Sequence, residues 1–422
     1  MTSYNTIIAM AFAGALDLQM FAEPAVQTPD NGTYGVSGMN TTESEGLSVG
    51  MKKFYKTALL ENARANLVFN QFGKKQPLAK GNGKTVEFRR YKSFDKALTP
   101  LVEGVIPSGH KMEASAITVS LKQYGDYVPI SDILEFANVD PILAEAVKEN
   151  GGQAGATLDT LTRDVVCAGT ELYFASPISN PLMLGYGEDG DRIASKLIAK
   201  AGTILKKTNT PKINGEYIGI IHPSVAYDLR QDPGWLSAHE YAKPDEIFNG
   251  EIGKLHGFRF LETTEAKIEK VTMEVASTST TTSVTVKGIW GENFSGKAVA
   301  AEAFSPAGVK VCDVTITGCT ATGENTVLTV STLGTTLSAG FTVVAKKAHY
   351  NCLFFGADAW GTVEANGMRL ESIIKDKTQG GGPLNQFSTA GWKAMHAAVI
   401  LYQDRMLNLL CSSSFCDTDE EN

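Results

Sequence analysis

A long polar segment between two short β-strands is the feature that most constrains the fold of this chain. Thr85–Tyr91 (TVEFRRY) predicts one strand, and Ile117–Lys122 predicts a second through strict apolar/polar alternation. Between them lie about two dozen residues, 92–116, rich in proline, glycine and charge. A lone two-stranded ribbon is marginal in water, and a structureless connection this long is unusual inside a compact domain. We therefore expect the region Thr85–Val128 to find its core outside its own domain, on other copies of the protein.

Length and charge exclude some classes of protein. With 422 residues the chain is long enough for two or three domains, each with its own core. Its net charge of −8 argues against general nucleic-acid binding. Residues 1–51 hold five acids and no Lys or Arg, whereas residues 52–92 hold eleven bases and two acids. This contrast indicates either a solvated surface or a basic segment that lies on an acidic neighbouring subunit.

The six cysteines and the N-terminus bear on the cellular compartment. Without framework or C-x-x-C spacing, the cysteines predict reduced thiols of a cytosolic protein; a bridge between Cys312 and Cys319 across a hairpin is the less favoured alternative. Ile7–Ala13 is apolar like a secretory signal, but the first basic residue is Lys52. No run approaches the roughly 18 apolar residues of a membrane span. We expect neither export nor a membrane partner. The six cysteines of the chain are Cys167, Cys312, Cys319, Cys352, Cys411 and Cys416.

The rest of the chain reads as helices and strands in alternation. Leu47–Phe72 has a partial helical stripe, and Asp140-Pro141 opens a helix to about Gly169. Glycines at 151, 152 and 155 weaken that helix and suggest a bend. A second α/β region starts with the helix Ile193–Lys207, the strand Tyr217–Ile221 and a helix at His222-Pro223. The tail, Cys411–Asn422, is acidic and is predicted to be disordered.

Composition changes abruptly between residues 267 and 348. The sequence there contains short segments rich in Thr and Val, separated by glycine-containing turns. This pattern predicts short strands and a small all-β insertion such as a sandwich. The predicted strands are Ser283–Lys287, Val309–Thr317, Thr326–Ser331 and Phe341–Ala345. The α/β pattern then resumes at Asn351–Gly356, Gly361–Glu364 and Ala397–Leu401.

Few residues could carry chemistry. Gly185–Asp191 gathers three acids but lacks the alternating ligands and final Glu of a calcium loop, so a turn is favoured over a metal site. His222, Asp228 and His239 are the raw material of a metal or acid–base hydrolase, although a structural role is favoured. No G-x-S-x-G elbow, P-loop or H-E-x-x-H motif occurs. We predict no enzyme, no catalytic residue, no cofactor and no metal.

A set of short phrases spans about residues 47–265 and 349–410. In their order and spacing they resemble the major capsid proteins of tailed bacteriophages, which have the Hong Kong 97-like coat fold. The resemblance is strongest to the subgroup named after the coat protein of coliphage N-four. The phrases are Phe54-Tyr55 with Leu59–Arg64, Gly83–Arg89, Glu103–Val105 with Pro107–Gly109, Tyr124–Tyr127 with Ser131-Asp132, Leu158–Asp164, Ile220–Pro223, Asn249–Gly253, Gly257–Thr264, Gly356–Ala359 and Pro383–Gln386.

The resemblance implies an α+β, Hong Kong 97-like fold with an all-β insertion domain. The long ribbon corresponds to the family's extended loop, which lies across a neighbouring subunit. The implied division is an N-terminal arm and helix (1–72), an extended β-loop (73–130, tip about 92–116), a peripheral domain with a spine helix (131–192), an axial domain (193–266), the insertion (267–348), the remaining axial and peripheral parts (349–410) and the tail (411–422).

The implied function is a coat subunit of a tailed phage (Caudoviricetes) that self-assembles into pentamers and hexamers of an icosahedral head. It would enclose double-stranded DNA without sequence-specific binding, be made in the host bacterial cytoplasm and reside in the virion. Implied partners are other copies, a separate scaffolding protein, a portal and a possible decoration protein. An encapsulin-like nanocompartment shell is the alternative. The candidate inter-subunit contacts are Lys52, Lys53, Arg89, Arg90, Lys92, Lys96, Glu103 and Lys111.

Overall fold

The computed structural model describes two parts of the chain, each with its own internal contacts. One comprises the described residues of 125–151 and 371–393, and the other those of 63–124, 152–370 and 394–422. The N-terminal arm and most of the helix predicted from Leu47 lie outside the described residues. None of the helices within the described ranges is long and apolar enough to cross a membrane. The described ranges are 68–78, 83–91, 111–137, 142–176, 180–187, 190–239, 253–290, 297–365, 371–375 and 384–422, together with residues 94, 96, 98, 100, 103, 104, 106 and 109.

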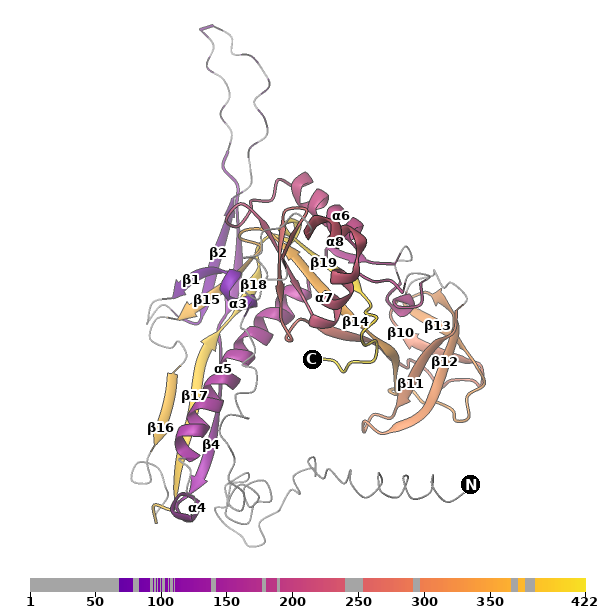
Figure 1. Cartoon of the computed structure of the whole chain (residues 1–422). Helices are drawn as coiled ribbons and strands as arrows, with labels where there is room; N and C mark the ends of the chain where they lie inside the picture. Colours follow the sequence, from indigo (N-terminus) through magenta and orange to yellow (C-terminus); the bar gives the residue numbers. More distant parts are fainter. Residues whose placement is uncertain are drawn as a thin grey trace. The chain divides into compact units, whose positions relative to one another are not determined.

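The first part is a three-stranded sheet with helices. The strands run in the order β16-β17-β4 (Figure 1). The Asn150 amide of α5 donates to the Ala390 carbonyl of β17 at 3.0 Å, which ties the start of this helix to the sheet. Helix α5 continues without interruption through the glycines at 151, 152 and 155. The elements are β4 (Lys122–Ser131), α4 (Asp132–Ala137), α5 (Ile142–Cys167), β16 (Glu371–Lys375) and β17 (Phe387–His396).

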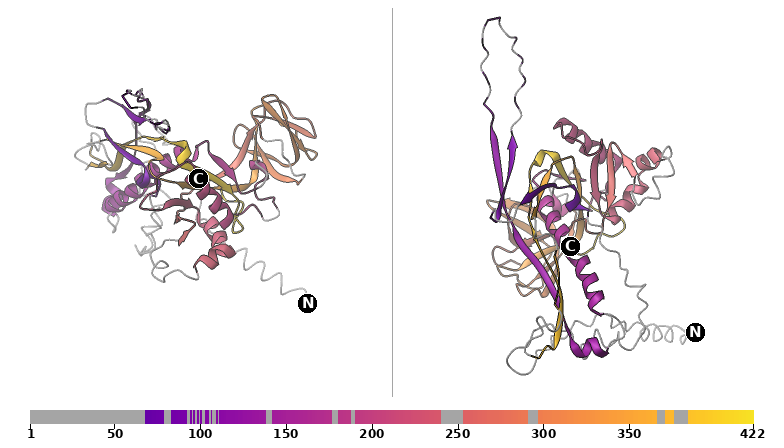
Figure 2. Two further views of the ribbon diagram at one scale, coloured as in Figure 1. Left: turned by 90° about the horizontal axis from the view of Figure 1, so that it is seen from above. Right: turned by 90° about the vertical axis from the view of Figure 1, so that its left-hand side faces the viewer.

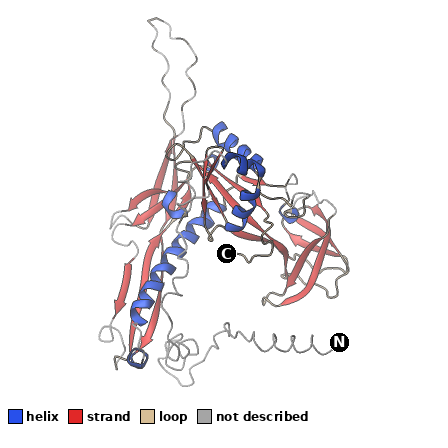
Figure 3. Ribbon diagram, in the orientation of Figure 1, coloured by secondary structure: helices blue, strands red, loops and turns tan. Residues whose placement is uncertain are grey.

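The second part is organised by one long strand, β14 (Thr342–Phe355), at the centre of a mixed sheet (Figure 3). Its end pairs antiparallel with β6 on one side and β19 on the other. Strand β8 adds to β6 in parallel, β7 pairs antiparallel with β8, and β5 joins β19 in parallel. The bounds are β5 (Leu172–Phe174), β6 (Tyr217–Ile221), β7 (Gly253–Leu255), β8 (Phe258–Glu262) and β19 (Met406–Cys411).

Each face of this sheet has its own apolar core, because successive side chains of a strand point to opposite faces. Cys352 and Phe354 of β14 belong to the core under three helices, whereas Leu353 and Phe355 belong to the opposite core. Such near-continuous apolar strands are typical of sheets covered on both faces. The covering helices are α6 (Ser195–Lys207), α7 (Pro223–Gln231) and α8 (Pro233–His239).

The opposite core is closed by α3 (Phe69–Phe72) and the second half of α5. The buried Asp159 carboxylate accepts hydrogen bonds from the Val68 and Asn70 amides, at 3.1 and 2.8 Å. Phe69 and Val166 pack there with Trp360. A buried carboxylate thus replaces water at the start of α3, where helix amides have no partner within the helix.

The residues between 267 and 348 close into a ring of antiparallel strands. The pairings run β9-β14-β11-β12-β13-β10, and the Val275–Val286 bridge joins β10 back to the end of β9. Val286, Ile316 and Val343 lie in the buried core of this barrel. The sandwich expected from the sequence is therefore a barrel, which the bridge from Val275 to Val286 closes. The strands are β9 (Ile268–Glu274), β10 (Ser283–Lys287), β11 (Val299–Phe304), β12 (Lys310–Thr322) and β13 (Asn325–Val330).

Two short 3₁₀ helices lie within the described ranges, and the state of the cysteines can be read there too. All six cysteines are free thiols. The hairpin bridge between Cys312 and Cys319 is excluded because both lie on β12, seven positions apart. Strand β14 passes through position 348 without a break, and whether 267–348 is an insertion stays a prediction. The 3₁₀ helices are η3 (Pro181–Met183) and η5 (Gln403–Arg405).

The tail is ordered against the sheet, so the prediction of a disordered tail is wrong. Ser414 donates its amide to the Asp228 carboxylate at 2.9 Å, and the Ala348 amide donates to the Asp417 carbonyl at 2.7 Å. The sequence misled because acidic, polar residues normally favour solvent. Here the tail both accepts a hydrogen bond from a sheet amide, at Asp417, and donates one to a buried carboxylate, from Ser414.

Candidate functional site

The ribbon predicted from the sequence forms, and its base is anchored within its own chain. Strands β2 (Thr85–Tyr91) and β3 (Ala114–Ser120) pair antiparallel, from Thr85 opposite Ser120 to Tyr91 opposite Ala114 (Figure 2). Val86 and Phe88 are buried in a cluster with Val363 of the same chain. The expectation that the ribbon has no core of its own is therefore wrong for its base.

The base packs on a small sheet of three strands. Strand β15 pairs in parallel with β1 and antiparallel with β18. Leu121, which lies between β3 and β4, completes the cluster together with Ala397 and Leu401. The bounds of this sheet are β1 (Lys74–Leu78), β15 (Trp360–Ala365) and β18 (Ala398–Ile400).

Beyond the base, the ribbon exposes large apolar side chains. Leu98 and Ile106 are 83% and 93% exposed. In the described part of the chain, β2 and β3 pair as strands only with each other. Exposed apolar groups gathered in one segment mark an interaction surface more reliably than single ones do. The exposed apolar residues of the ribbon are Tyr91, Phe94, Leu98, Ile106 and Met112.

The predicted contact residues fall into three groups. Arg90 is engaged within its own chain: its guanidinium lies 5.4 Å from the Tyr402 ring centre and donates to the Leu401 carbonyl. Arg89 pairs with Glu87 on the same strand at 3.1 Å. The other described members, Lys96, Glu103 and Lys111, are exposed along the ribbon. Lys52, Lys53 and Lys92 lie outside the described residues.

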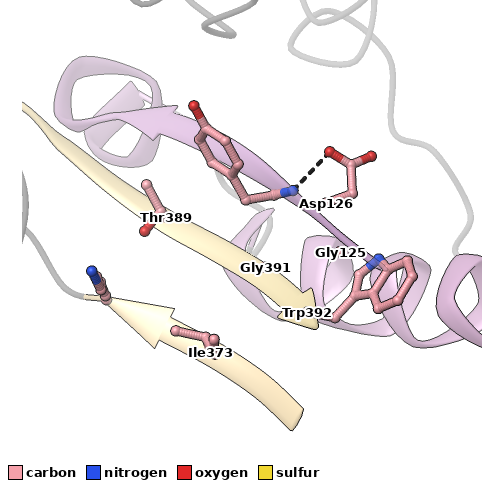
Figure 4. Close-up of a pocket in the computed structure, with 8 residues that line it drawn as sticks. Gly125, Asp126, Ile373, Thr389, Gly391 and Trp392 are labelled. Atoms are coloured by element: carbon pink, nitrogen blue, oxygen red, sulfur yellow. Dashed lines mark hydrogen bonds between the residues drawn. The ribbon is translucent and has the colours of Figure 1, made fainter. Parts of the chain in front are cut away.

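The sheet of the first part carries a second surface, a shallow groove of about 370 Å³ (Figure 4). Glycines let β4 and β17 approach closely: a Cβ atom at Gly391 would lie 2.7 Å from the Tyr127 Cβ, and one at Gly125 would lie 2.6 Å from the Trp392 carbonyl oxygen. Ile373 and Thr389 also line this groove. Ile133, Phe136 and Leu384 of the same part are exposed as well.

The residues considered for a hydrolase are used structurally. His222 precedes α7, accepts the Ser224 amide at 3.2 Å and stacks on the Tyr350 ring at 5.1 Å. Burial lowers the pKa of this imidazole. Asp228 holds Ser414 of the tail, and His239 lies at the end of α8. No cluster of three or more metal-ligating side chains occurs within the described ranges.

Of the three acids in the loop considered for a metal, Asp191 is described and holds a turn, whereas Glu188 and Asp189 lie outside the described residues. The Asp191 carboxylate accepts hydrogen bonds from the amides of Gly185 and Gly187, at 2.9 and 3.0 Å. Gly185 has a φ of +80°, which favours glycine there. This oxygen is occupied by backbone donors, as the turn interpretation expects.

Sequence reasoning missed the apolar members of the ribbon and the groove. This reasoning selected charged residues between 92 and 116, although Phe94, Leu98 and Ile106 lie in the same polar segment. Large apolar residues inside a segment expected to be exposed are the signal that could have found them. The groove depends on Gly125 and Gly391, which are 266 positions apart, so the sequence offered no comparable signal for it.

The fold resembles those of several solved phage capsids. The capsid structure of the cyanophage P-SCSP1u matches with a TM-score of 0.53 and 14% identity, over 91% of this chain and 100% of that one. The cyanophage Pam1 capsid asymmetric unit gives 0.52 and 10%, over 91% and 99%. The capsid of Ralstonia phage GP4 gives 0.51 and 11%, over 95% and 98%. No protein-family model and no curated protein matches the sequence. The chain therefore shares the fold of phage capsid proteins.

Proposed function

We propose that this protein is the major capsid protein of a tailed, double-stranded DNA bacteriophage, and that it assembles into the pentamers and hexamers of an icosahedral head. The observation that carries the proposal is the extent of the fold likeness. It covers at least 91% of this chain and at least 98% of each of the three capsid chains. Fold alone does not determine function, so the exposed surfaces of the chain supply the second argument.

The ribbon has the form of an assembly element. Its base is fixed on Val363 and Leu401, so the subunit can present it before assembly. Its exposed apolar side chains, such as Leu98 and Ile106, gain burial when they pack on another copy. Lys96, Glu103 and Lys111 would supply polar contacts at the rim. In a closed symmetric assembly each such contact is repeated by every subunit.

The finer layout follows the Hong Kong 97-like arrangement. In this proposal residues 73–130 are the extended loop, 131–192 the peripheral domain with its spine helix, 193–266 the first part of the axial domain, and 349–410 the remaining axial and peripheral parts. The barrel formed by 267–348 would be an addition to the coat fold. A separate scaffolding protein, a portal and a decoration protein are the proposed partners, and the DNA is enclosed without sequence readout.

Electron microscopy of the purified chain tests this proposal. We expect capsomers or closed shells in negative stain, and a mass in light scattering that corresponds to many copies. Deletion of Thr99–Gly109 should leave a folded subunit that cannot close a shell. A compact monomer at every concentration would overturn the proposal, and native particles that enclose a protein cargo in place of DNA would favour an encapsulin-like shell.

A further inference from the structure

The end of the chain forms a strap, defined here as residues 415–422, that is hydrogen-bonded to β14 and β9. Figure 1 shows it as the yellow segment that ends at the C-terminus. On β14, strand β11 pairs up to Ala345 and strand β19 pairs from Tyr350 onward. Between them, the Ala348 amide donates to the Asp417 carbonyl at 2.7 Å. The Tyr350 hydroxyl donates to the Cys416 carbonyl at 2.9 Å and to the Asp419 carboxylate at 2.6 Å. The strap thus accepts a hydrogen bond from a backbone amide that the strand pairing leaves open, and it also binds the Tyr350 hydroxyl.

On β9 the strap caps two backbone amides with side chains. The Lys270 amide donates to the Glu421 carboxylate at 2.8 Å, and the Ile268 amide donates to the Asn422 side-chain carbonyl at 2.9 Å. These two amides are two residues apart and therefore point to the same side of the strand. Unpaired amides of this kind are the groups to which an added peptide strand binds.

Cations match the acids of the strap. The Lys347 ammonium lies 3.2 Å from the Asp417 carboxylate. Arg163, only 1% exposed, donates to the Asn422 backbone carbonyl at 2.7 Å. Hydrogen bonds that involve a charged partner are the stronger ones, and they favour an occupant that carries carboxylates.

The strap buries little apolar surface of its own. Its one large apolar residue, Phe415, is 69% exposed and touches Tyr227 with ring centres 5.5 Å apart. Glu421 and Asn422 are exposed. Strands and helices in proteins are held mainly by apolar burial, which is missing here. A segment held mainly by polar contacts can leave without disturbing the core beneath it.

We propose that the surface under the strap, formed by Ile268, Lys270, Lys347, Ala348 and Tyr350, is a docking site for an extended peptide that carries carboxylates. The resident strap is its displaceable occupant, and the strap of a second copy is the partner that fits it. The inference does not depend on shell assembly, because it needs only two chains in solution.

A labelled peptide with the sequence of residues 412–422 tests the site on the full-length chain. The receptor is a variant whose own strap is weakened by D417N, D419N and E421Q. We expect this variant to bind the peptide at least tenfold more tightly than the wild-type chain does, because its own strap competes less. A scrambled peptide of the same composition should bind at least tenfold more weakly. No binding to the variant, or equal binding of the scrambled peptide, would overturn the proposal.

Two further measurements separate docking from non-specific attraction. Y350F, placed in the weakened receptor, keeps the ring but removes its hydrogen bonds to the strap, so the affinity should fall several-fold. Y217F is the matched control, because the Tyr217 hydroxyl bonds to the Thr210 carbonyl, away from the strap; it should leave the affinity unchanged. Hydrogen exchange in the wild-type chain should be faster at residues 415–422 than in β19, and equal protection would contradict a displaceable strap.

Discussion

Phe88 of the ribbon lies directly over Gly361 of β15. A Cβ atom at position 361 would come within 2.6 Å of the Phe88 Cε1 atom, closer than real Cβ atoms approach. The missing side chain of one strand therefore provides the space in which the ribbon's base ring packs. This contact anchors the base of the ribbon formed by β2 and β3, although the far end of the ribbon is exposed.

Gly361→Ala should loosen that root. The added methyl group must displace the Phe88 ring or the backbone, and overpacking of this kind costs about 1–3 kcal/mol of unfolding free energy. Urea unfolding followed by circular dichroism measures the loss. Gly334→Ala is the control, because a Cβ atom at Gly334 meets nothing within 4 Å; equal effects of the two changes would contradict this packing.

The exposed and buried residues of the ribbon should separate folding from assembly. Leu98→Ser and Ile106→Ser should change the unfolding free energy by less than about 0.5 kcal/mol, as surface substitutions do. They should nevertheless lower the yield of assembled particles in sedimentation. Phe88→Ala should instead lower the unfolding free energy by about 3–5 kcal/mol, because it empties a packed site. Normal assembly of the Leu98 and Ile106 variants would remove the ribbon from the proposed interface.

Gly152→Ala should stabilise the subunit. Gly152 lies inside α5, and a Cβ atom there would meet nothing within 4 Å. Alanine is favoured over glycine in a helix interior by about 1 kcal/mol. Thermal unfolding should therefore shift upward. If the glycine pair also permits a bend during assembly, the same variant will form shells less efficiently while its subunit is more stable.

His349 should make the fold sensitive to mild acid. Burial lowers the pKa of its imidazole from 6.5 to about 4, although the Glu269 carboxylate lies 4.0 Å away. Below pH 6.5 the His349 imidazole binds a proton in the unfolded chain but stays neutral in the folded chain. The unfolding free energy therefore falls as the pH drops toward 4. Between pH 7 and pH 5 this loss is about 2 kcal/mol.

His349→Gln should remove that part of the pH dependence. Urea unfolding of the variant and of the wild-type chain at pH 7 and pH 5 gives the comparison. Identical differences between the two pH values would show that His349 is not the responsible group.

Asp228→Ala should weaken the attachment of the tail. It removes the charged acceptor of the Ser414 amide, and a hydrogen bond to a charged group contributes about 1.5–3 kcal/mol. Asp228→Asn retains one acceptor oxygen and should lose less. Hydrogen exchange at Ser414 reports the change directly, and unchanged protection in the alanine variant would contradict the assigned contact.

Much of the secondary structure was predictable because it follows from local patterns of apolar and polar residues. The strand Tyr217–Ile221 was expected with the bounds that the structure has, and β10 likewise matches the strand predicted at Ser283–Lys287. The predicted proline-led helix after His222 is confirmed as α7. The pairing of Thr85–Tyr91 with the strand near Ile117 followed from alternation on both sides of one connection. Periodicity and caps act over a few residues, so sequence alone reveals them.

The sequence by itself determined the ribbon, the long helix α5 and the start of a β-rich region at residue 267. Only the tertiary structure decided that Phe88 finds its core on Gly361, that β9 and β10 meet to close a barrel, and that Asp417 and Glu421 bind backbone amides of β14 and β9. The physical reason is distance along the chain. Each of those contacts depends on which distant backbone groups stay unpaired, and which spaces stay unfilled, after the strands have paired. No local pattern of residues specifies these groups and spaces.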